Sequence, residues 1–300
     1  PAARSMLTEA LANSPKWAGI IIGHGCDATN RHFDIWRKHV PTDFIYWFNN
    51  PMNSTPSAAK FFVVELKRMI KTLESQFHIK ISEDDLRNAM EYSNRVKALL
   101  REISALRSTH DIPNRLYFEI CLQSVQPSTL PDRDILKFLE QTLVKCKKLP
   151  PFPSGKHKIL LTGSDITYPE WMDLLEEANL RVVRDDLSIG ERYYATSIPL
   201  ETIPDPLEAL THYYMNIPKP ATKNPPDSRL DFLLNAAKSS HVEGVLSQNL
   251  KFCEPYAFDS VFTMGTFKAA GIPAMHLERE FTPQSDQQLR TRLEAFTEIL

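Results

Sequence analysis

The sequence predicts an α/β protein built of two Rossmann-like parallel-sheet units with a helical insertion between them. Short apolar runs alternate with longer amphipathic segments near both ends of the chain, and the pattern in the middle is continuously helical. Strands that alternate with helices of this length imply right-handed crossovers and therefore parallel sheets. A chain of 300 residues is also long enough to form two such units.

In the first half of the chain, apolar runs predict strands over residues 17–24 and 43–48. Helical spacing predicts further elements at 4–13, 30–39, 57–77, 82–106 and through most of 113–148. Ser82 and the three acidic residues that follow it are typical of a helix N-cap and an acidic first turn.

The Pro-rich segment from Leu149 to Gly155 is the clearest break in the chain. It predicts a first domain over 1–150, formed by an α/β unit and the helical region, and a second Rossmann-like domain over 151–300. In the second half, the same reasoning predicts strands at 158–161, 180–183, 242–247 and 272–277, and helices at 169–178, 228–239, 256–270 and 286–300.

Composition excludes several classes of function. A formal net charge of −2 gives the chain no overall excess of positive charge with which to bind nucleic acid or an anionic membrane. No apolar run reaches the roughly 18–20 residues of a membrane helix, and no signal peptide is visible. Four cysteines in a chain of this length do not form a disulfide scaffold, which favours a cytoplasmic location. Neither a dinucleotide-binding glycine motif nor a Walker A motif is present.

Two cysteines occupy matching positions. Cys26 and Cys253 each end a strand-like run and are followed at once by an acidic residue. Loops beyond the carboxyl ends of parallel strands are where ligands gather, and thiolates are preferred ligands of iron–sulfur clusters and zinc. The alternative is that both are small buried residues. No CxxC pair accompanies either cysteine, which argues against a zinc ribbon or ferredoxin-type site. Cys121 and Cys146 are most simply a core residue and a helix residue.

Two further strand ends carry polar candidates. Ser164 lies in a loop between a strand and a helix, where backbone amides can bind an anion, although an ordinary turn would have the same sequence. Arg192 follows the next strand and could hold a phosphate or carboxylate, with Asp185 and Asp186 as caps or orienting groups; surface salt bridges are the alternative.

The two histidines that flank Cys26, His24 and His32, could donate a hydrogen bond to a cluster sulfur or to a substrate, or could be structural.

The residues around these sites resemble the 2-hydroxyacyl-CoA dehydratase / benzoyl-CoA reductase family, the iron–sulfur component with paired homologous subunits. The most specific match is Lys251-Phe252-Cys253-Glu254-Pro255. The supporting segments, spread along nearly the whole chain, are Cys26-Asp27, 61–74, Gly163-Ser164, 176–178, 183–187, 190–193, 270–273 and 291–296.

The resemblance implies Rossmann-like units and one [4Fe–4S] cluster held by three cysteines. Two of the three correspond to Cys26 and Cys253. The third is expected upstream of Pro1, unless another ligand replaces it. Cys121 and Cys146 do not fall at the family's ligand positions.

The resemblance also implies one-electron chemistry on a CoA thioester, through a ketyl radical anion. The partners would be a homologous subunit in a heterodimer and a separate ATP-hydrolysing iron–sulfur activator. The outcome would be dehydration of a 2-hydroxyacyl-CoA or, alternatively, reduction of the benzoyl-CoA ring. Ser164 and Arg192 are the candidate substrate-binding residues. A double-cubane cluster reductase and a non-catalytic structural subunit are the remaining alternatives.

Overall fold

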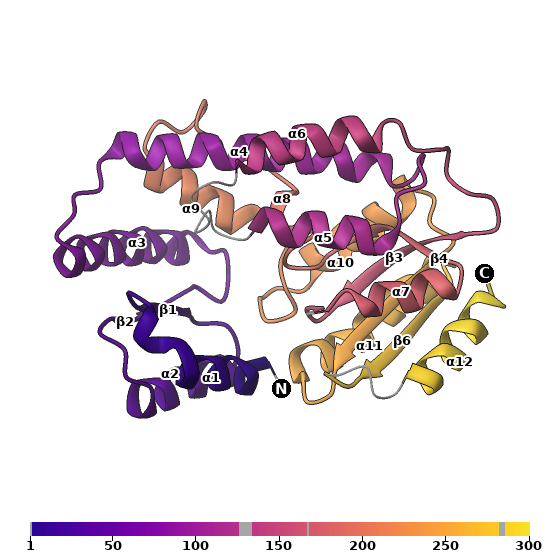
Figure 1. The fold of residues 1–300 in the computed structure, drawn as a ribbon, viewed down its shortest axis with the longest axis horizontal. Helices are drawn as coiled ribbons and strands as arrows, with labels where there is room; N and C mark the ends of the chain where they lie inside the picture. The colour runs from indigo at the N-terminus through magenta and orange to yellow at the C-terminus, as the bar shows by residue number, and fades with distance from the viewer. Residues whose placement is uncertain (1, 126–133, 167, 282–285) are drawn as a thin grey trace. The chain divides into compact units, whose positions relative to one another are not determined.

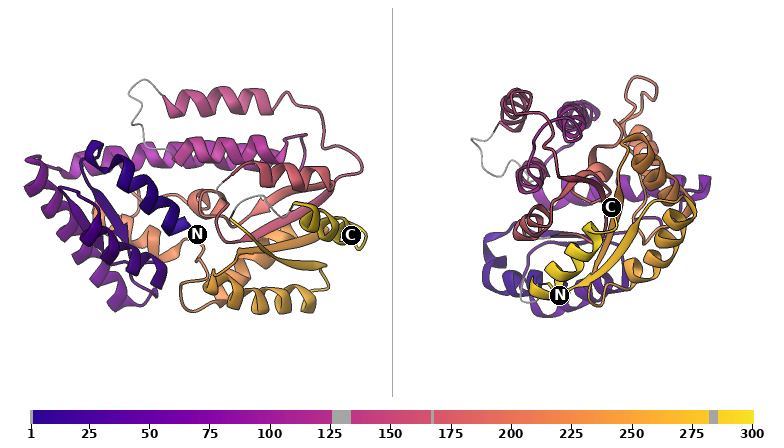
Figure 2. Two further views of the ribbon diagram at one scale, coloured as in Figure 1. Left: turned by 60° about the horizontal axis from the view of Figure 1, so that its bottom comes forward. Right: turned by 90° about the vertical axis from the view of Figure 1, so that its right-hand side faces the viewer.

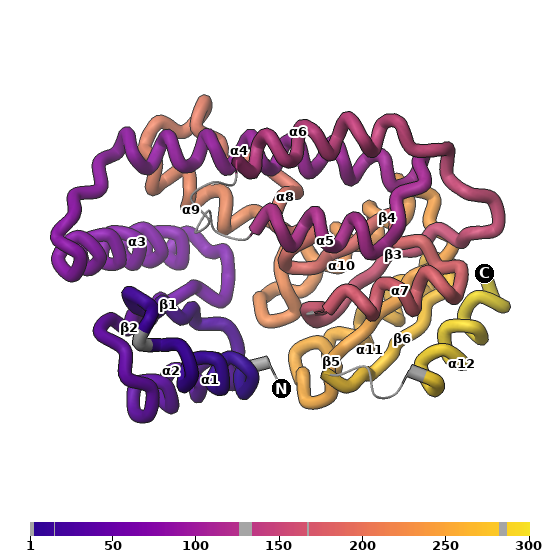
Figure 3. The backbone as a smooth tube through the Cα atoms, in the orientation of Figure 1, coloured from indigo at the N-terminus to yellow at the C-terminus, as the bar shows by residue number. Residues whose placement is uncertain are grey.

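The computed structural model describes residues 2–125, 134–166, 168–281 and 286–300, which form two compact units (Figures 1 and 3). Unit 1 consists of Pro1–Glu91, Ile198–Asn216 and Thr222–Asn224, and unit 2 of Tyr92–Ser197, Ile217–Ala221 and Pro225–Leu300. Each unit contains a parallel sheet, so the predicted α/β class is confirmed. None of the described helices is long and apolar enough to cross a bilayer.

Unit 1 is built around a two-stranded parallel sheet of β1 (Ile20–Gly23) and β2 (Ile45–Phe48). The helices α1 (Ala2–Asn13) and α2 (Asp27–His39), joined to the sheet partly through the short 3-10 helix η1 (Ser14–Lys16), bury a core of Ala10, Ile22, Trp36 and Val40. α3 (Pro56–Phe77) packs its Phe62 ring against Phe48 of β2, and α9 (Pro206–Asn216) packs against α3.

The division between the units falls within α4 (Glu83–Leu106). In unit 2, α4 packs with α5 (Asn114–Val125) and α6 (Ile135–Cys146) around a core that includes Leu100, Ile103 and Leu139. The predicted helical region over 113–148 therefore contains two helices in its described part; residues 126–133 lie outside the described residues.

The sheet of unit 2 has four parallel strands in the order β4-β3-β5-β6. The strands are β3 (His157–Gly163), β4 (Leu180–Asp185), β5 (Gly244–Leu250) and β6 (Ala274–Arg279). Helices α7 (Glu170–Glu177) and α12 (Asp286–Thr297) cover one face, and α10 (Asp227–Ser239) and α11 (Glu254–Ala269) cover the other (Figure 2). Alternation along β3 explains both layers, because Ile159 and Leu161 face the first pair of helices and Leu160 faces the second.

The Pro-rich segment 149–155 lies inside unit 2, where it connects the helices to the sheet. The Asp111 amide donates to the Pro150 carbonyl at 2.8 Å, and the Phe152 amide donates to the Thr109 carbonyl at 2.9 Å. These bonds tie the segment to the loop after α4, so the break in the sequence pattern joins two parts of one compact unit.

Two strands extend further than their apolar runs predict. β5 continues through Gln248 and Asn249, and β4 continues through Asp185. These polar side chains are buried and have partners inside the fold. A strand that buries polar residues at its end does not show its full length in a hydrophobic pattern. The short α8 (Glu191–Tyr194) and the Pro-flanked α9 were not predicted.

Candidate functional site

The carboxyl edge of the four-stranded sheet is the candidate site of unit 2. The chain passes from β3 to β4 on one side and then crosses to β5 on the other side of β3. The strand order therefore reverses between β3 and β5, and ligands in open α/β sheets bind outside the carboxyl ends of such a pair. Ser164 follows β3 and Cys253 follows β5, so the structure brings these two predicted residues to the same edge of the sheet.

Ser164 joins the ends of the two strands. Its hydroxyl accepts a hydrogen bond from the Leu250 amide at 2.9 Å, and its own amide donates to the Gln248 carbonyl at 3.0 Å. The Gln248 side chain donates in return to the Ser164 carbonyl. Ser164 is buried, so its hydroxyl is committed to holding the loop after β3 against β5.

Arg279, at the end of β6, is buried and contacts this loop. Its Nε donates to Oε1 of Gln248 at 2.7 Å, and a terminal nitrogen donates to the Asp165 carbonyl at 2.7 Å. Burial lowers the pKa of Arg279, and its interactions with Tyr168, Asp165 and the Cys253 thiol partly offset that effect. The guanidinium therefore places a positive charge within electrostatic reach of Cys253.

Cys253 is half-buried and forms the N-cap position of α11. Its amide donates to the Leu250 carbonyl at 2.9 Å, and its carbonyl accepts from the Ala257 amide at 3.0 Å. The preceding residue, Phe252, has a φ of 66° and is 89% exposed. A left-handed conformation is unfavourable for a side chain as large as Phe, and such strain concentrates at functional sites.

Arg192 reaches the same edge from α8. One terminal nitrogen donates to the Tyr256 hydroxyl at 2.6 Å, and the other lies 4.0 Å from the Asp165 carboxylate. Tyr256 stands in the first turn of α11, three residues after Cys253. Arg192 is 6% exposed, so its charge is buried between the Tyr256 hydroxyl and the exposed Asp165 carboxylate.

A second buried cluster of charged residues lies next to the site and connects the elements that form it. Arg229 of α10 pairs with Asp186 at 3.0 Å and with Asp259 of α11 at 2.6 Å, and it donates to the Thr162 hydroxyl at 2.8 Å. Burial raises the pKa of Asp186, while the Arg229 charge opposes that rise. The cluster connects the end of β3, the loop after β4 and two helices.

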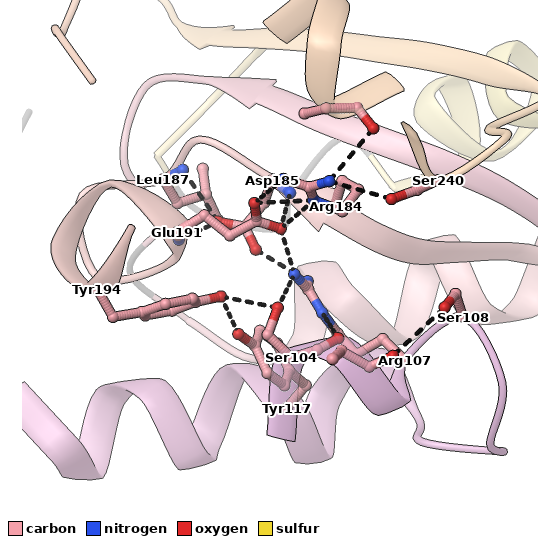
Figure 4. A network of polar contacts seen from close by, with 12 residues as sticks. Ser104, Arg107, Ser108, Tyr117, Arg184, Asp185, Leu187, Glu191, Tyr194 and Ser240 are labelled. Atoms are coloured by element: carbon pink, nitrogen blue, oxygen red, sulfur yellow. Dashed lines mark hydrogen bonds and ion pairs between the residues drawn. The ribbon is translucent and has the colours of Figure 1, made fainter. Parts of the chain in front are cut away.

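Asp185 belongs to a different network, which fixes α8 (Figure 4). Its carboxylate accepts from the backbone amides of Leu187 and Glu191 at 3.1 and 3.0 Å, and pairs with Arg107 at 2.9 Å. Glu191 pairs with Arg107 at 2.6 Å and with Arg184 at 2.7 Å. Both Asp185 and Glu191 are buried, so these contacts are internal ion pairs that orient the turn carrying Arg192.

Cys26 is positioned in the corresponding way in unit 1. It follows β1 and forms the N-cap position of α2, where its amide donates to the Thr29 hydroxyl at 3.1 Å. His24, two residues before it, is half-buried and packs its ring against Trp47. His32, six residues after Cys26 in α2, is buried, packs against Trp36, and has its pKa lowered by burial.

Ser164, Arg192 and Cys253 thus come together in unit 2, whereas Cys26 belongs to unit 1. Cys121 and Cys146 are both buried at 1% exposure in the helical core of unit 2. Within the described ranges, no three His, Cys, Asp or Glu side chains gather closely enough to hold a metal ion.

Sequence reasoning did not identify Tyr256, Gln248 or Arg279 as parts of this edge. The sequence signal that could have identified them is their position. Tyr256 lies in the first turn of a predicted helix, and Gln248 and Arg279 lie at the ends of β5 and β6.

Comparison with known proteins gives a consistent result. The family described as "2-hydroxyglutaryl-CoA dehydratase, D-component" matches residues 1–300. The chain is 25% identical over 289 residues to the (R)-phenyllactyl-CoA dehydratase beta subunit of Clostridium sporogenes, covering 94% of this chain and 75% of that protein. It is 23% identical to the (R)-2-hydroxyglutaryl-CoA dehydratase subunit beta of Acidaminococcus fermentans, covering 94% and 76%.

Similarity extends to a reductase as well. A benzoyl-CoA reductase subunit of Thauera aromatica is 22% identical over 246 residues, which cover 79% of this chain and 62% of that protein. The family resemblance inferred from the sequence motifs is confirmed by these matches.

Proposed function

Because the chain belongs to the 2-hydroxyglutaryl-CoA dehydratase D-component family, we propose that it is the iron–sulfur subunit of an enzyme that dehydrates a 2-hydroxyacyl-CoA. The observation that carries this proposal is the position of Cys253 at the strand-order reversal, beside the buried charges of Arg279 and Arg192. The relatives named as dehydratase subunits match 94% of the chain, whereas the reductase subunit matches 79%, which favours dehydration. Reduction of the benzoyl-CoA ring is the second candidate.

The thiol positions fit an iron–sulfur cofactor. Cys26 and Cys253 are each half-buried and directly precede a helix, whose N-terminal partial charge favours an anionic ligand. We assign both as ligands of a [4Fe–4S] cluster. The described residues do not complete a ligand set by themselves. When bound, such a cluster supplies one-electron transfer and a Lewis-acidic iron for a substrate oxygen.

The neighbouring side chains have distinct roles in this proposal. Arg192, oriented by Tyr256, provides a buried positive charge for a phosphate or carboxylate of the substrate. Ser164 acts by holding the loop after β3 in place, since its hydroxyl already bonds to β5. Arg279 is buried and offsets the negative charge of a Cys253 thiolate.

The proposal includes two protein partners, namely a homologous subunit in a heterodimer and an ATP-hydrolysing iron–sulfur activator. The relatives in the comparison are named as subunits, which supports the first partner. The substrate is an acyl-CoA, and neither nucleic acid nor a membrane is a partner. All four cysteines are free thiols, which supports a cytoplasmic location.

The ligand assignment is tested by anaerobic purification of the chain with its partner subunit, followed by an iron and sulfide count. Cys26→Ala and Cys253→Ala are each expected to reduce the iron content and the cluster absorbance of the complex. Cys121→Ala and Cys146→Ala are matched controls that should retain both. Iron content at the wild-type level in Cys253→Ala would overturn its assignment as a ligand.

The reaction is tested on the iron-loaded complex with its activator and ATP. Turnover of a 2-hydroxyacyl-CoA supports dehydration, and turnover of benzoyl-CoA alone supports the second candidate. An iron-loaded complex that binds both substrates and converts neither contradicts both proposals.

A further inference from the structure

Helix α11 has its polar and apolar faces inverted. The side that packs against the sheet carries Asp259, Ser260 and Thr263, all buried, together with Phe267. The outer side carries Phe258, Val261 and Phe262, which are 73%, 70% and 59% exposed. A helix on the surface of a globular unit normally turns its apolar face inward. Here the inner face is polar because Asp259 and Thr263 surround the buried guanidinium of Arg229.

The outer residues form one continuous stripe. Phe258, Val261, Phe262 and Gly265 follow the spacing that places side chains on a single helix face. Gly265 leaves a gap in the stripe, since an added Cβ would meet no atom within 4 Å. A contiguous exposed apolar surface of this kind marks an interaction site.

Charged residues of opposite sign stand at the two ends of the stripe. Glu254 begins α11 and Lys268 lies in its last turn, and both side chains are exposed on the same face as the apolar residues. Neither forms a salt bridge with another residue in the part of the chain that the structure describes. Glu254 and Lys268 are each seven residues away from Val261, which is therefore the centre of the stripe.

This arrangement is complementary to itself. When two copies of α11 lie antiparallel across a two-fold axis at Val261, Glu254 of each copy is level with Lys268 of the other. Phe258 of each copy is then level with Met264 of the other, about 1.5 Å of helix rise from the gap at Gly265. Both relations follow from the constant rise per residue of a helix and the reversal of direction by a two-fold axis.

We propose that the outer face of α11 is a self-association surface, occupied by the same face of a second copy of this chain. Charge complementarity supports this occupant, because the stripe supplies the partner for each of its own end charges. An interface in which the same patch serves both subunits is the commonest form of homodimer contact. The proposal is independent of the cluster assignment and of the reaction.

The surface is tested by sedimentation equilibrium of the complete chain over a range of concentrations. We expect a reversible dimer, and Val261→Arg should raise its dissociation constant by about a hundredfold, because it brings two like charges together at the axis. Val144→Arg is the matched control, since Val144 is also exposed, at 53%, but lies on α6. Circular dichroism establishes that both variants are folded.

A charge-reversal cycle tests the antiparallel register. Glu254→Lys and Lys268→Glu should each weaken the dimer about three- to tenfold at low salt, because each creates two like-charged pairs across the axis. The double variant should return the dissociation constant to the wild-type level, since both pairs are again of opposite sign.

A chain that remains monomeric at 100 micromolar or so, well above the dissociation constants of specific homodimers, would overturn the proposal. So would a dimer that Val261→Arg leaves intact, or charge reversals that the double variant does not rescue. If a different protein or another segment of the chain occupies the stripe, the purified chain remains monomeric, which is the first of these outcomes.

Discussion

Gly163, at the end of β3, lies so close to the backbone of Gln248 in β5 that an added Cβ would stand 1.7 Å from the Gln248 carbonyl oxygen. Gly163 also has a φ of 128°, which a side chain rarely adopts. This approach brings the loop containing Ser164 directly against the strand that leads to Cys253. The carboxyl edge of the sheet therefore depends on one residue without a side chain.

We expect Gly163→Ala to lower the free energy of unfolding by about 2–4 kcal/mol, because the methyl group adds a backbone clash to an unfavourable φ. Gly155→Ala is the matched control, since Gly155 also has a positive φ but open space around its Cα. That variant should lose about 1 kcal/mol. Urea unfolding measures both, and equal losses would contradict the close approach of β3 and β5.

The network around Arg107 predicts a large stability loss on removal of a single charge. Arg107 is 1% exposed and pairs with both Asp185 and Glu191. Arg107→Met should lower the free energy of unfolding by about 3–5 kcal/mol, because it leaves buried carboxylates uncompensated. The exposed pairs of Arg115 with Glu119 and Asp173 serve as a comparison. Arg115→Met should lose at most about 1 kcal/mol in the same denaturant titration.

Lys97 predicts a rise of stability with pH. Burial lowers the pKa of Lys97 from 10.5 to about 8, with a further contribution from Arg101. Between these two values the unfolded chain binds the proton and the folded chain does not, so the free energy of unfolding increases as the pH rises through this window. We expect Lys97→Met to remove about 1–3 kcal/mol of this increase. Unfolding titrations at pH 7 to 10 check the slope, and equal slopes for the variant and wild type would contradict the prediction.

In the iron-free folded protein, two of the four thiols should be reactive and the other two unreactive. Cys26 and Cys253 are half-buried, whereas Cys121 and Cys146 are fully buried. Burial raises the pKa of the Cys121 thiol to about 12 and also raises the pKa of the Cys146 thiol. Reaction with a disulfide reagent at pH 8 should be slower at Cys121 and Cys146 by about a hundredfold or more.

Mass spectrometry of the labelled peptides identifies which thiols have reacted, and the chain unfolded in urea provides the control in which all four react. Rapid labelling of Cys121 in the folded chain would show that its environment is open to solvent.

Much of the fold could be predicted because its signals are local. Apolar runs located all six strands of the described ranges, and helical spacing located the helices from α1 to α12 with the exceptions of α8 and α9. The family and the α/β class were also predicted correctly. The four-residue α8 is too short to show a period, and α9 is surrounded by prolines that obscured its pattern.

The neighbours of Cys253 could not be predicted in the same way. Gln248 and Arg279 meet near this residue only because β5 lies next to β6, and Arg192 reaches Tyr256 from a helix that follows β4. The order of strands in a sheet is set by long-range packing, and no local pattern in the sequence encodes it. The assignment of Cys26 and Cys253 as cluster ligands remains a prediction.

The sequence by itself determined where each cysteine stands relative to a strand and a helix, because hydrophobic periodicity reports local backbone structure directly. The tertiary structure decided which side of each element is buried. α11 shows the difference most clearly, since its pattern predicts a helix but not an outward apolar face. That inversion follows from Arg229, a buried charge on another helix, whose requirement for Asp259 and Thr263 outweighs the usual preference for burying Phe258 and Phe262.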